Sequence, residues 1–532
     1  MTGTTAEPAA PAAGPSQPGE DYDRLPYPSM PFADTQPSRL AALATLFGLN
    51  PPGIATANVL ELGCASGGNI IPLAARFPQS RFTGIDLSRR HVEDGRQRAA
   101  ALGLTNVTLE QADLAALDLS GQQFDYIICN GVFSWVPQPV QEAVFRLCRD
   151  TLAPDGVATI SYNVLPGWHM RMVIRDLCLH FAGTEGPPQH RAARARAALT
   201  QIAAASDARE PYGMLLRTEA QRFKGVPSAY IMGEFLAPDN APCTVQEFIG
   251  RAARHGLDFL CEADLCAAVP PTLDPAIRAR LTSFAGPDRA ATEQQLDFVT
   301  GRLFRRSVLV RTRPATGPTH APNSEQLARL HMDAPIRLDP TQSTAQASVF
   351  TDDRAQPTTV NDPAISRAIG RLAAAFPGTM TLAQLTSDPT CSADDAARIR
   401  QALFTMVLAG RAGISALPAP HAEPIQPFPC AWPVARLEAA SGQPWLTSLR
   451  HVGVPAHPVL KELMPLLDGK HDRTMLQAHL AAALREGKLP PPKSPGDGQP
   501  PSPDHLDALA AQSLGWALAY LARHGFLEPP GA

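Results

Sequence analysis

The stretch VLELGCASGGN, residues 59–69, combines an apolar run, one acid and a glycine-rich bend. This pattern predicts a buried strand that leads through a tight turn into a helix, which is a usual place for a nucleotide-like cofactor. Gly63, Ala65 and Gly68 nearly satisfy the dinucleotide fingerprint G-x-G-x-x-G. Asp86 ends the next predicted strand, at about the right distance to accept hydrogen bonds from ribose hydroxyls. Taken alone, these residues fit a nicotinamide enzyme and a methyl-donor enzyme equally, and also a turn without a ligand.

Three further features favour a methyl donor over a dinucleotide. Glu61 stands on the strand before the turn, where an acid would repel a pyrophosphate but suits the cationic amino-acid end of S-adenosylmethionine. Asp113 follows the third predicted strand and can accept from an adenine amino group, with Leu114 against the ring, although Asp113 can also cap a helix. The fourth predicted strand ends in CNGVFSW, residues 129–135, whose aromatic side chains suit a methyl acceptor in a dry slot.

Aromatic residues make up only 6% of the chain. Four of them nevertheless fall at or just after the ends of the fourth and fifth predicted strands: Phe133, Trp135, Tyr162 and Trp168. Ligands bind at that edge of an open α/β sheet, so we predict that the aromatic residues form an acceptor wall; packing beneath inserted helices is the alternative. His169 is either a general base or an exposed helix residue. Phe32 and Tyr27 could close over the cofactor as a lid. We assign to catalysis Trp135, Tyr162 and His169, and to the acceptor side Tyr27, Phe133, Asn163 and Trp168.

The segments that must position these residues alternate between strand-like and helix-like patterns. The strand patterns cover 59–63, 81–88, 107–114, 124–130 and 157–163. This alternation predicts right-handed βαβ units and an α/β fold with a Rossmann-like parallel sheet. Later strands near 257–262 and 307–312 are expected to complete the sheet, with inserted helices over its C-terminal edge.

We divide the 532-residue chain into five parts. They are a disordered Ala/Pro-rich tail (1–24), a cofactor-binding core (25–182), a helical insertion with the final strands (183–313), a linker (314–360) and a mainly α C-terminal region (361–532). The last part shows two winged-helix-like units of short helices, each ending in a strand-like tail. Their helices lack a basic stripe, so we do not expect DNA binding.

Composition narrows the function classes further. The net charge of -4, the five lysines and the lack of a polybasic run argue against a nucleic-acid partner. Nine dispersed cysteines without CxxC pairs predict free thiols in a reducing compartment and no metal site. The chain shows no signal-peptide pattern at its start and no run of 18 apolar residues, so we expect a cytoplasmic protein without a membrane span.

Several longer stretches between about 25 and 313 carry recognisable motifs. They are YPSMPFADTQPSRLAALATLFGL (27–49), VLELGCASGGNIIPLA (59–74), FTGIDLS (82–88), FDYIICNGVFSWVP (124–137), ISYNVLPGWHMR (160–171), the segment 230–265 and RLFRRSVLV (302–310). Together they resemble the class I S-adenosylmethionine-dependent methyltransferases. More narrowly, they are similar to the bacterial enzymes with a methyltransferase regulatory domain, a group that includes the rickettsial-type protein lysine methyltransferases.

The resemblance implies the cofactor S-adenosylmethionine and a set of residues around it. Glu61, Gly63 and Gly67 would surround its methionine moiety, Asp86 would hold the ribose, Asp113 and Leu114 the adenine, and Asn130 would flank the methionine portion. Asn130 and Gln36 stand where the family often has histidine, and neither amide titrates near neutral pH. A mechanism that needs a histidine base at these two positions is therefore in doubt. Ala65, where the family often has glycine, is a smaller departure.

Two hypotheses about function remain open at this point. The first is a methyltransferase that acts on a protein side chain, with lysine favoured, by in-line transfer in which alignment and exclusion of water do most of the work. A small-molecule acceptor is its close competitor. The second is a non-catalytic protein that binds S-adenosylmethionine as a sensor and acts through its C-terminal winged-helix-like units. The sequence leaves the oligomeric state open, with a homodimer as one option.

Overall fold

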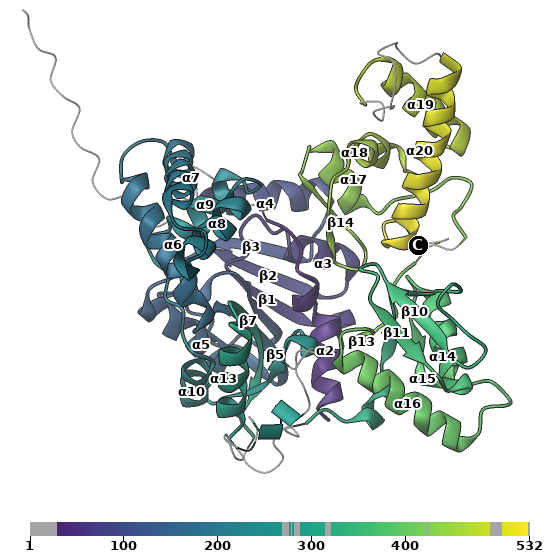
Figure 1. The fold of residues 1–532 in the computed structure, drawn as a ribbon, viewed down its shortest axis with the longest axis horizontal. Coiled ribbons are helices and arrows are strands. Elements are labelled where there is room, and N and C mark those ends of the chain that lie inside the picture. The colour runs from purple at the N-terminus through teal and green to yellow at the C-terminus, as the bar shows by residue number, and fades with distance from the viewer. Residues whose placement is uncertain are drawn as a thin grey trace, which may run out of the picture.

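The computed structural model describes residues 29–268, 276–277, 279–280, 283, 288–313, 321–421, 424–489 and 503–529. In Figure 1 a central sheet has helices α6–α9 on its left and two further units, in green and yellow, on its right. The predicted tail, 1–24, lies outside the described residues. Within the described ranges, no helix combines the length and the apolar character needed to cross a membrane.

Seven strands form one mixed sheet in the order β3-β2-β1-β4-β5-β7-β6. The strands are β1 (Asn58–Leu62), β2 (Arg81–Asp86), β3 (Val107–Gln111), β4 (Phe124–Cys129), β5 (Leu152–Asn163), β6 (Leu257–Glu262) and β7 (Phe304–Arg311). Neighbouring strands are parallel except at β7, which runs antiparallel to both β5 and β6. The predicted Rossmann-like α/β fold is confirmed. Because the order reverses between β1 and β4, their C-terminal ends form the switch point at which open sheets bind ligands.

Helices cover both faces of this sheet. They are α2 (Pro37–Leu46), α3 (Ile70–Arg76), α4 (Arg89–Ala101), α5 (Gln138–Thr151), α10 (Val245–Arg254), α11 (Leu265–Ala268) and α13 (Arg289–Thr300). Along β1, Val59 enters one core cluster while Leu60 and Leu62 enter the other, as the two-residue period of a strand requires. Both faces are therefore dry, which explains why the strands read as nearly continuous apolar runs.

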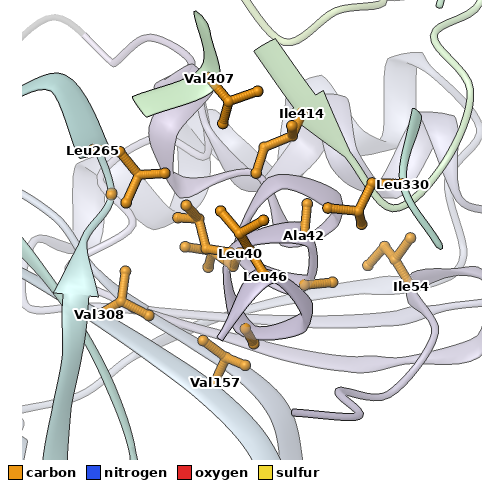
Figure 2. Close-up of a cluster of buried hydrophobic side chains, with 14 of the residues drawn as sticks. Leu40, Ala42, Leu46, Ile54, Val157, Leu265, Val308, Leu330, Val407 and Ile414 are labelled. Atoms are coloured by element: carbon orange, nitrogen blue, oxygen red, sulfur yellow. The ribbon is translucent and has the colours of Figure 1, made fainter. Parts of the chain in front are cut away.

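Helix α2 packs between the sheet and the unit formed by residues 321–421. Figure 2 shows Leu40 and Leu46 of α2 between Val157 and Val308 of the sheet and Ile414 of the green unit. Nine of its ten residues are buried, because α2 has apolar neighbours on nearly every side. The core of the sheet thus continues into residues 321–421.

A separate helical layer lies over the C-terminal ends of β4 and β5. It contains α6 (Gly167–Ala182), α7 (Pro188–Ala205), α8 (Pro211–Phe223) and α9 (Ser228–Phe235). Ile174 and Cys178 of α6 are buried in the same cluster as residues of the later helices, so the layer starts with α6 and not at residue 183. After α9 the backbone N–H of Ala241 donates to the carbonyl of Ser134 at 2.8 Å, which fixes the loop above the end of β4.

The predicted linker, 314–360, is wrong for the residues described from 321 on. They form η4 (Ser324–Arg329), β8 (His331–Asp333), β9 (Ile336–Leu338), β10 (Ser348–Asp352) and β11 (Pro357–Val360). Leu327, Leu330 and Met332 are buried in the core that includes α2. Strands of three to five residues are too short to show a period of two, and β8 pairs with partners far along the chain.

The same unit continues to residue 421. Its later elements are α14 (Pro363–Ala375), β12 (Met380–Thr381), α15 (Leu382–Leu385), α16 (Ala393–Leu408) and β13 (Gly413–Ser415). Strand β8 lies between β12 and β13 in a three-stranded sheet. The helices of the first expected winged-helix-like unit therefore depend on a strand from the supposed linker.

The last unit has its own core and a short hairpin. Its elements are α17 (Pro433–Ala440), β14 (Trp445–Thr447), β15 (Gly453–Pro455), α18 (Pro458–Leu463), η5 (Met464–Leu466), α19 (Arg473–Arg485) and α20 (Pro503–Arg523). The expected strand at the end of this unit is reduced to a single bridge between Ala431 and Leu527. In Figure 1 the hairpin strand β14 lies beside α3, at the edge of the sheet layer.

Candidate functional site

The turn after β1 has the backbone geometry of a ligand cradle. Gly63, Ala65 and Gly67 all adopt positive φ, at 75°, 47° and 73°. A Cβ on Gly63 would lie 2.2 Å from a methyl carbon of Val132, so the turn also requires the absence of a side chain there. The predicted strand, turn and helix are present at the switch point of the sheet.

The N-terminal segment packs directly against this turn. The Gly68 N–H donates to Ser29 Oγ at 2.7 Å, and a Cβ on Gly68 would lie 2.3 Å from the Ser29 carbonyl carbon. The Phe32 N–H donates to Asn69 Oδ1 at 3.0 Å. Tyr27, the other predicted lid residue, lies outside the described residues. The described part of the segment thus closes one side of the turn.

Glu61 is a buried acid whose charge is only partly compensated. Its Oε1 accepts from the Asn69 side-chain amide at 2.8 Å, whereas its buried Oε2 has no hydrogen-bond partner. Burial, reinforced by the nearby Asp86, raises the pKa of Glu61 to about 8. No described lysine, arginine or histidine forms an ion pair with it. A cation bound beside this oxygen would stabilise the charged form of the buried carboxylate.

Asp86 lies at the end of β2, next to the turn. Its two carboxylate oxygens accept from the backbone N–H groups of Ala65 at 2.8 Å and Ser88 at 2.9 Å. Beyond β3, Asp113 Oδ1 accepts from the Ala115 N–H at 2.9 Å within a turn, and no helix follows, so Asp113 does not cap a helix. Leu114 is buried in the sheet core. These acids line up along the C-terminal ends of β2 and β3, in the order that the sequence predicts.

Asn130, at the end of β4, is held by a residue that sequence reasoning missed. Arg306 of β7 donates from Nε to Asn130 Oδ1 at 3.0 Å and forms an ion pair with Asp34 at 2.7 Å. Burial lowers the pKa of Arg306, and Asp34 opposes that shift. The only signal in the sequence is the pair Arg305-Arg306 at the start of a strand whose later residues are mostly apolar.

Two of the predicted site aromatics belong to the core, which corrects their assignment to an open acceptor wall. Phe133 is 0% exposed and packs edge-to-face on Phe145 and Phe248. Tyr162 stacks on Phe248 at 3.9 Å between ring centroids, and its hydroxyl lies 3.1 Å from Ser307 Oγ. Burial raises the pKa of Tyr162 well above its usual value. The alternative, packing beneath the inserted helices, describes these two residues.

The other two aromatics form a pair at the junction of sheet and helical layer. The rings of Trp135 and Trp168 meet edge-to-face, with centroids 5.7 Å apart. Trp135 is partly exposed, whereas Trp168 is 1% exposed. His169, the next residue on α6, is exposed. Asn163 donates from Nδ2 to Asn240 Oδ1 at 3.3 Å, so it ties the end of β5 to the loop above it.

Glu234, on α9, is a titratable residue near this pair that the sequence did not single out. The Arg171 guanidinium lies 5.6 Å above the Trp168 ring, and one of its nitrogens is 4.0 Å from Glu234 Oε2. Burial raises the pKa of Glu234 to about 7, against the opposing charge of Arg171. Glu234 can therefore change protonation state near neutral pH.

One surface hollow lies at the other end of the sheet. Arg149, Asp155, Arg254 and Arg311 are among its lining residues. Arg149 and Asp155 precede the parallel part of β5, Arg254 precedes β6, and Arg311 ends the antiparallel β7. Because α/β sheets bind ligands at the carboxyl ends of their parallel strands, this hollow is not the functional site.

Comparison with known protein families assigns three segments. Residues 59–156 match the family described as "Methyltransferase domain", 227–311 match "Predicted methyltransferase regulatory domain", and 428–526 match "PKMT, C-terminal winged helix domain". The chain is also 34% identical over 240 residues to an uncharacterised protein of Rickettsia prowazekii, covering 45% of this chain and 96% of that protein.

The chain belongs to the class I S-adenosylmethionine-dependent methyltransferases. This confirms the resemblance inferred from the sequence, including the regulatory domain and the winged-helix region. A second uncharacterised protein of Rickettsia prowazekii is 37% identical over 289 residues, and the methyltransferase spans about half of its length, 52%.

The methyltransferase is also similar to a solved structure along almost its whole length. PKMT2 from Rickettsia typhi, solved alone and in complex with AdoHcy, is 25% identical with a TM-score of 0.82. The match covers 94% of this chain and 100% of that one. The arrangement of sheet, helical layer and the two later units is therefore shared with PKMT2.

Proposed function

We propose that this methyltransferase transfers a methyl group from S-adenosylmethionine to a protein side chain, with lysine as the favoured acceptor. The observation that carries the proposal is the similarity to PKMT2 over 94% of the chain, together with the PKMT-type winged-helix match at 428–526. In this proposal S-adenosylmethionine binds at the sheet, in the segment that matches the methyltransferase family. The units at 321–421 and 428–529 add surface that a large acceptor can use.

The turn after β1 fits the donor. S-adenosylmethionine carries a methyl group on a cationic sulfur, has an ammonium group and no phosphate. An ammonium beside the unpartnered Oε2 of Glu61 would return that carboxylate to its charged form. The positive-φ glycines, Gly63 and Gly67, would let the backbone approach the methionine moiety closely.

The remaining donor contacts follow from the ends of the strands. Asp86 would accept from the ribose hydroxyls, and Asp113 with Leu114 would bind the adenine. Asn130, oriented by Arg306, would flank the methionine portion. PKMT2 was solved in complex with AdoHcy, which supports the proposal that this chain binds S-adenosylmethionine and its demethylated product.

We place the acceptor beside Trp135 and Trp168, where the helical layer meets the ends of β4 and β5. Transfer breaks the S–CH3 bond, returns its electron pair to sulfur and forms the N–CH3 bond. A lysine ammonium must lose a proton before it can attack. Glu234 is suited to accept that proton because its pKa lies near 7, and His169 on α6 is the second candidate.

The test uses the full chain and S-adenosylmethionine with a radioactive methyl group. The protein is incubated with a methylation-free lysate, and the protein, nucleic-acid, lipid and small-molecule fractions are counted separately. Counts in protein that acid hydrolysis assigns to methyl-lysine would support the proposal. Counts only among small molecules would overturn the protein acceptor, and tight donor binding without any counts would favour a sensor.

A variant of the acceptor edge sharpens the same assay. Trp135→Ala is expected to lower turnover by about 10- to 100-fold while the affinity for S-adenosylhomocysteine stays unchanged, because Trp135 positions the acceptor and not the donor. Trp516→Ala, on exposed α20, is the matched control and should leave turnover intact. If Trp135→Ala turns over like the parent protein, the acceptor does not bind at this edge.

A further inference from the structure

A loop of the C-terminal domain reaches the turn of the donor site. Residues 448–452, between β14 and β15, place the imidazole of His451 2.8 Å from Asn69 Oδ1, across 382 residues of sequence. Next to it, Arg76 of α3 donates to the carbonyl of Leu449 at 2.8 Å. His451 is 2% exposed and has φ of 62°, a conformation that non-glycine residues adopt mainly at constrained positions.

The hydrogen bonds around Asn69 allow one arrangement of its side chain. Its amide group donates to Glu61 Oε1, so its carbonyl oxygen must face the donors. That oxygen accepts from the Phe32 N–H at 3.0 Å, from the Thr35 hydroxyl at 3.2 Å and from His451 Nε2 at 2.8 Å. His451 therefore carries its proton on Nε2. The imidazole is neutral, since burial and the nearby Arg76 lower its pKa to about 3.

We propose that His451 is a positioning residue for the methyl-donor site: its Nε2–H fixes the Asn69 carboxamide, which in turn orients Glu61 toward the donor. The winged-helix domain thereby completes a site that lies in another domain. This inference rests on the proposed function, because it assigns Glu61 to the donor.

A second contact from the same domain holds the other side of the turn. Arg98 of α4 donates from Nη1 to the Ser66 carbonyl at 3.2 Å and pairs through Nη2 with Glu438 of α17 at 3.3 Å. Glu438 also accepts from the N–H and the hydroxyl of Thr447, the residue that ends β14. The hairpin therefore contacts the turn at Ser66 through one relay and at Asn69 through the other.

These two relays couple domain docking to donor binding. If docking of the hairpin strengthens donor binding, the donor must strengthen docking by the same factor. The coupling gives the C-terminal domain a role in the reaction that requires neither a nucleic-acid partner nor direct contact with the acceptor.

The test compares two substitutions at one position. His451→Gln keeps a side-chain N–H that can reach Asn69, whereas His451→Leu fills similar space without a donor. Both are non-glycine residues at positive φ, so backbone strain is common to the two. Binding of S-adenosylhomocysteine to the full-length proteins is measured by calorimetry, after thermal unfolding has shown that each variant is folded at the assay temperature.

We expect His451→Leu to weaken binding of S-adenosylhomocysteine by at least about tenfold, because the buried Asn69 carbonyl loses the shortest of its three hydrogen bonds, the one that ties it to the C-terminal domain. His451→Gln should stay within about threefold of the parent protein. As a control, His479→Leu on α19, whose imidazole contacts Glu462 of α18 and not the turn, should bind like the parent.

Two results would overturn the positioning role. Parent-like affinity in both His451 variants would show that the contact does not act on the donor site. Equal weakening in both would show that the shape of the imidazole, and not its N–H, matters. Failure of the parent protein itself to bind S-adenosylhomocysteine would reject the proposed function instead, and the inference with it.

Discussion

Glu61 at the end of β1 and Ala65 in the turn after it differ from their neighbours in chemistry and in backbone strain. Glu61 has a buried oxygen without a partner, and Ala65 has a left-handed backbone that glycine adopts more easily. The unpartnered oxygen of Glu61 would be stabilised by a bound cation. The positive φ of Ala65 raises the free energy of the folded protein. Each can be tested by a single substitution.

Binding of S-adenosylhomocysteine at pH 6.5 is expected to release about one proton from Glu61. In the free protein its pKa is about 8, so the group is protonated, and the ligand ammonium would make it ionise. Apparent affinity should therefore rise with pH up to about 8. Calorimetry in buffers of different ionisation enthalpy measures the release. Glu61→Gln should abolish it and weaken binding at least about tenfold, while Glu110→Gln, on exposed β3, should not. An unchanged release in Glu61→Gln would contradict this assignment.

Ala65→Gly is expected to change the free energy of unfolding by less than about 0.5 kcal/mol. Relief of a positive-φ alanine, worth about 1 kcal/mol, offsets the larger chain entropy of glycine in the unfolded state. Ala193→Gly, on the exposed side of α7, should destabilise by about 1 kcal/mol because no strain is relieved there. Urea unfolding of both variants gives the comparison, and equal destabilisation would show that Ala65 is not strained.

At the scale of elements, the proposed acceptor site beside Trp135 and Trp168 depends on how α6 and α9 meet the ends of β4 and β5. Trp135 follows β4, Trp168 and Arg171 belong to α6, and Glu234 belongs to α9. No single segment could form this cluster. Its electrostatics arise because the helical layer buries an acid beside one guanidinium.

Glu234→Gln is expected to remove a pH dependence from turnover. The pKa of Glu234 is raised to about 7, so the carboxyl is protonated below pH 7 and cannot accept a proton, and the rate should fall as pH drops through 7. The variant should be slower by about 10²-fold above pH 7 and lack this acidic limb. Asp176→Asn, an exposed site on α6, is the control. If the fall in rate at low pH persists in Glu234→Gln, another group accepts the proton from the acceptor lysine. His169 would then be the next residue to substitute.

At the scale of the whole molecule, the domains share one network around the turn. Arg450, beside His451, forms an ion pair with Asp333 of β8 at 2.9 Å. The hairpin thus contacts the unit 321–421 as well as the donor turn. Docking of the C-terminal domain is therefore expected to affect overall stability as well as donor binding.

The stability advantage of the parent protein over His451→Gln should shrink in acid. The pKa of His451 is about 3 when folded and near 6.5 when unfolded, so the unfolded state binds the extra proton as pH falls. Stability from this histidine is present above pH 6.5 and is lost at about 1.4 kcal/mol per pH unit below it. Urea unfolding at pH 7.5 and pH 5 measures the difference. Parallel losses in both proteins would show that His451 is not buried as a neutral group.

The sequence by itself determined the sheet, the glycine-rich turn after β1 and the class of cofactor. The run 59–69 and the acids Asp86 and Asp113 lie next to one another along the chain or at the ends of successive strands. Parallel strands bring such ends to one edge, so local patterns suffice to predict the sheet, the turn and the class of cofactor.

Only the tertiary structure decided which aromatics are core, which strands fill the supposed linker and which distant residues contact the turn after β1. Phe133 and Tyr162 stand at strand ends like Trp135, but Phe248 from a later helix buries them. Strand β8 is too short to show a period, and its partners lie far along the chain. His451 meets Asn69 across 382 residues, a proximity that no local spacing encodes because two domain surfaces create it.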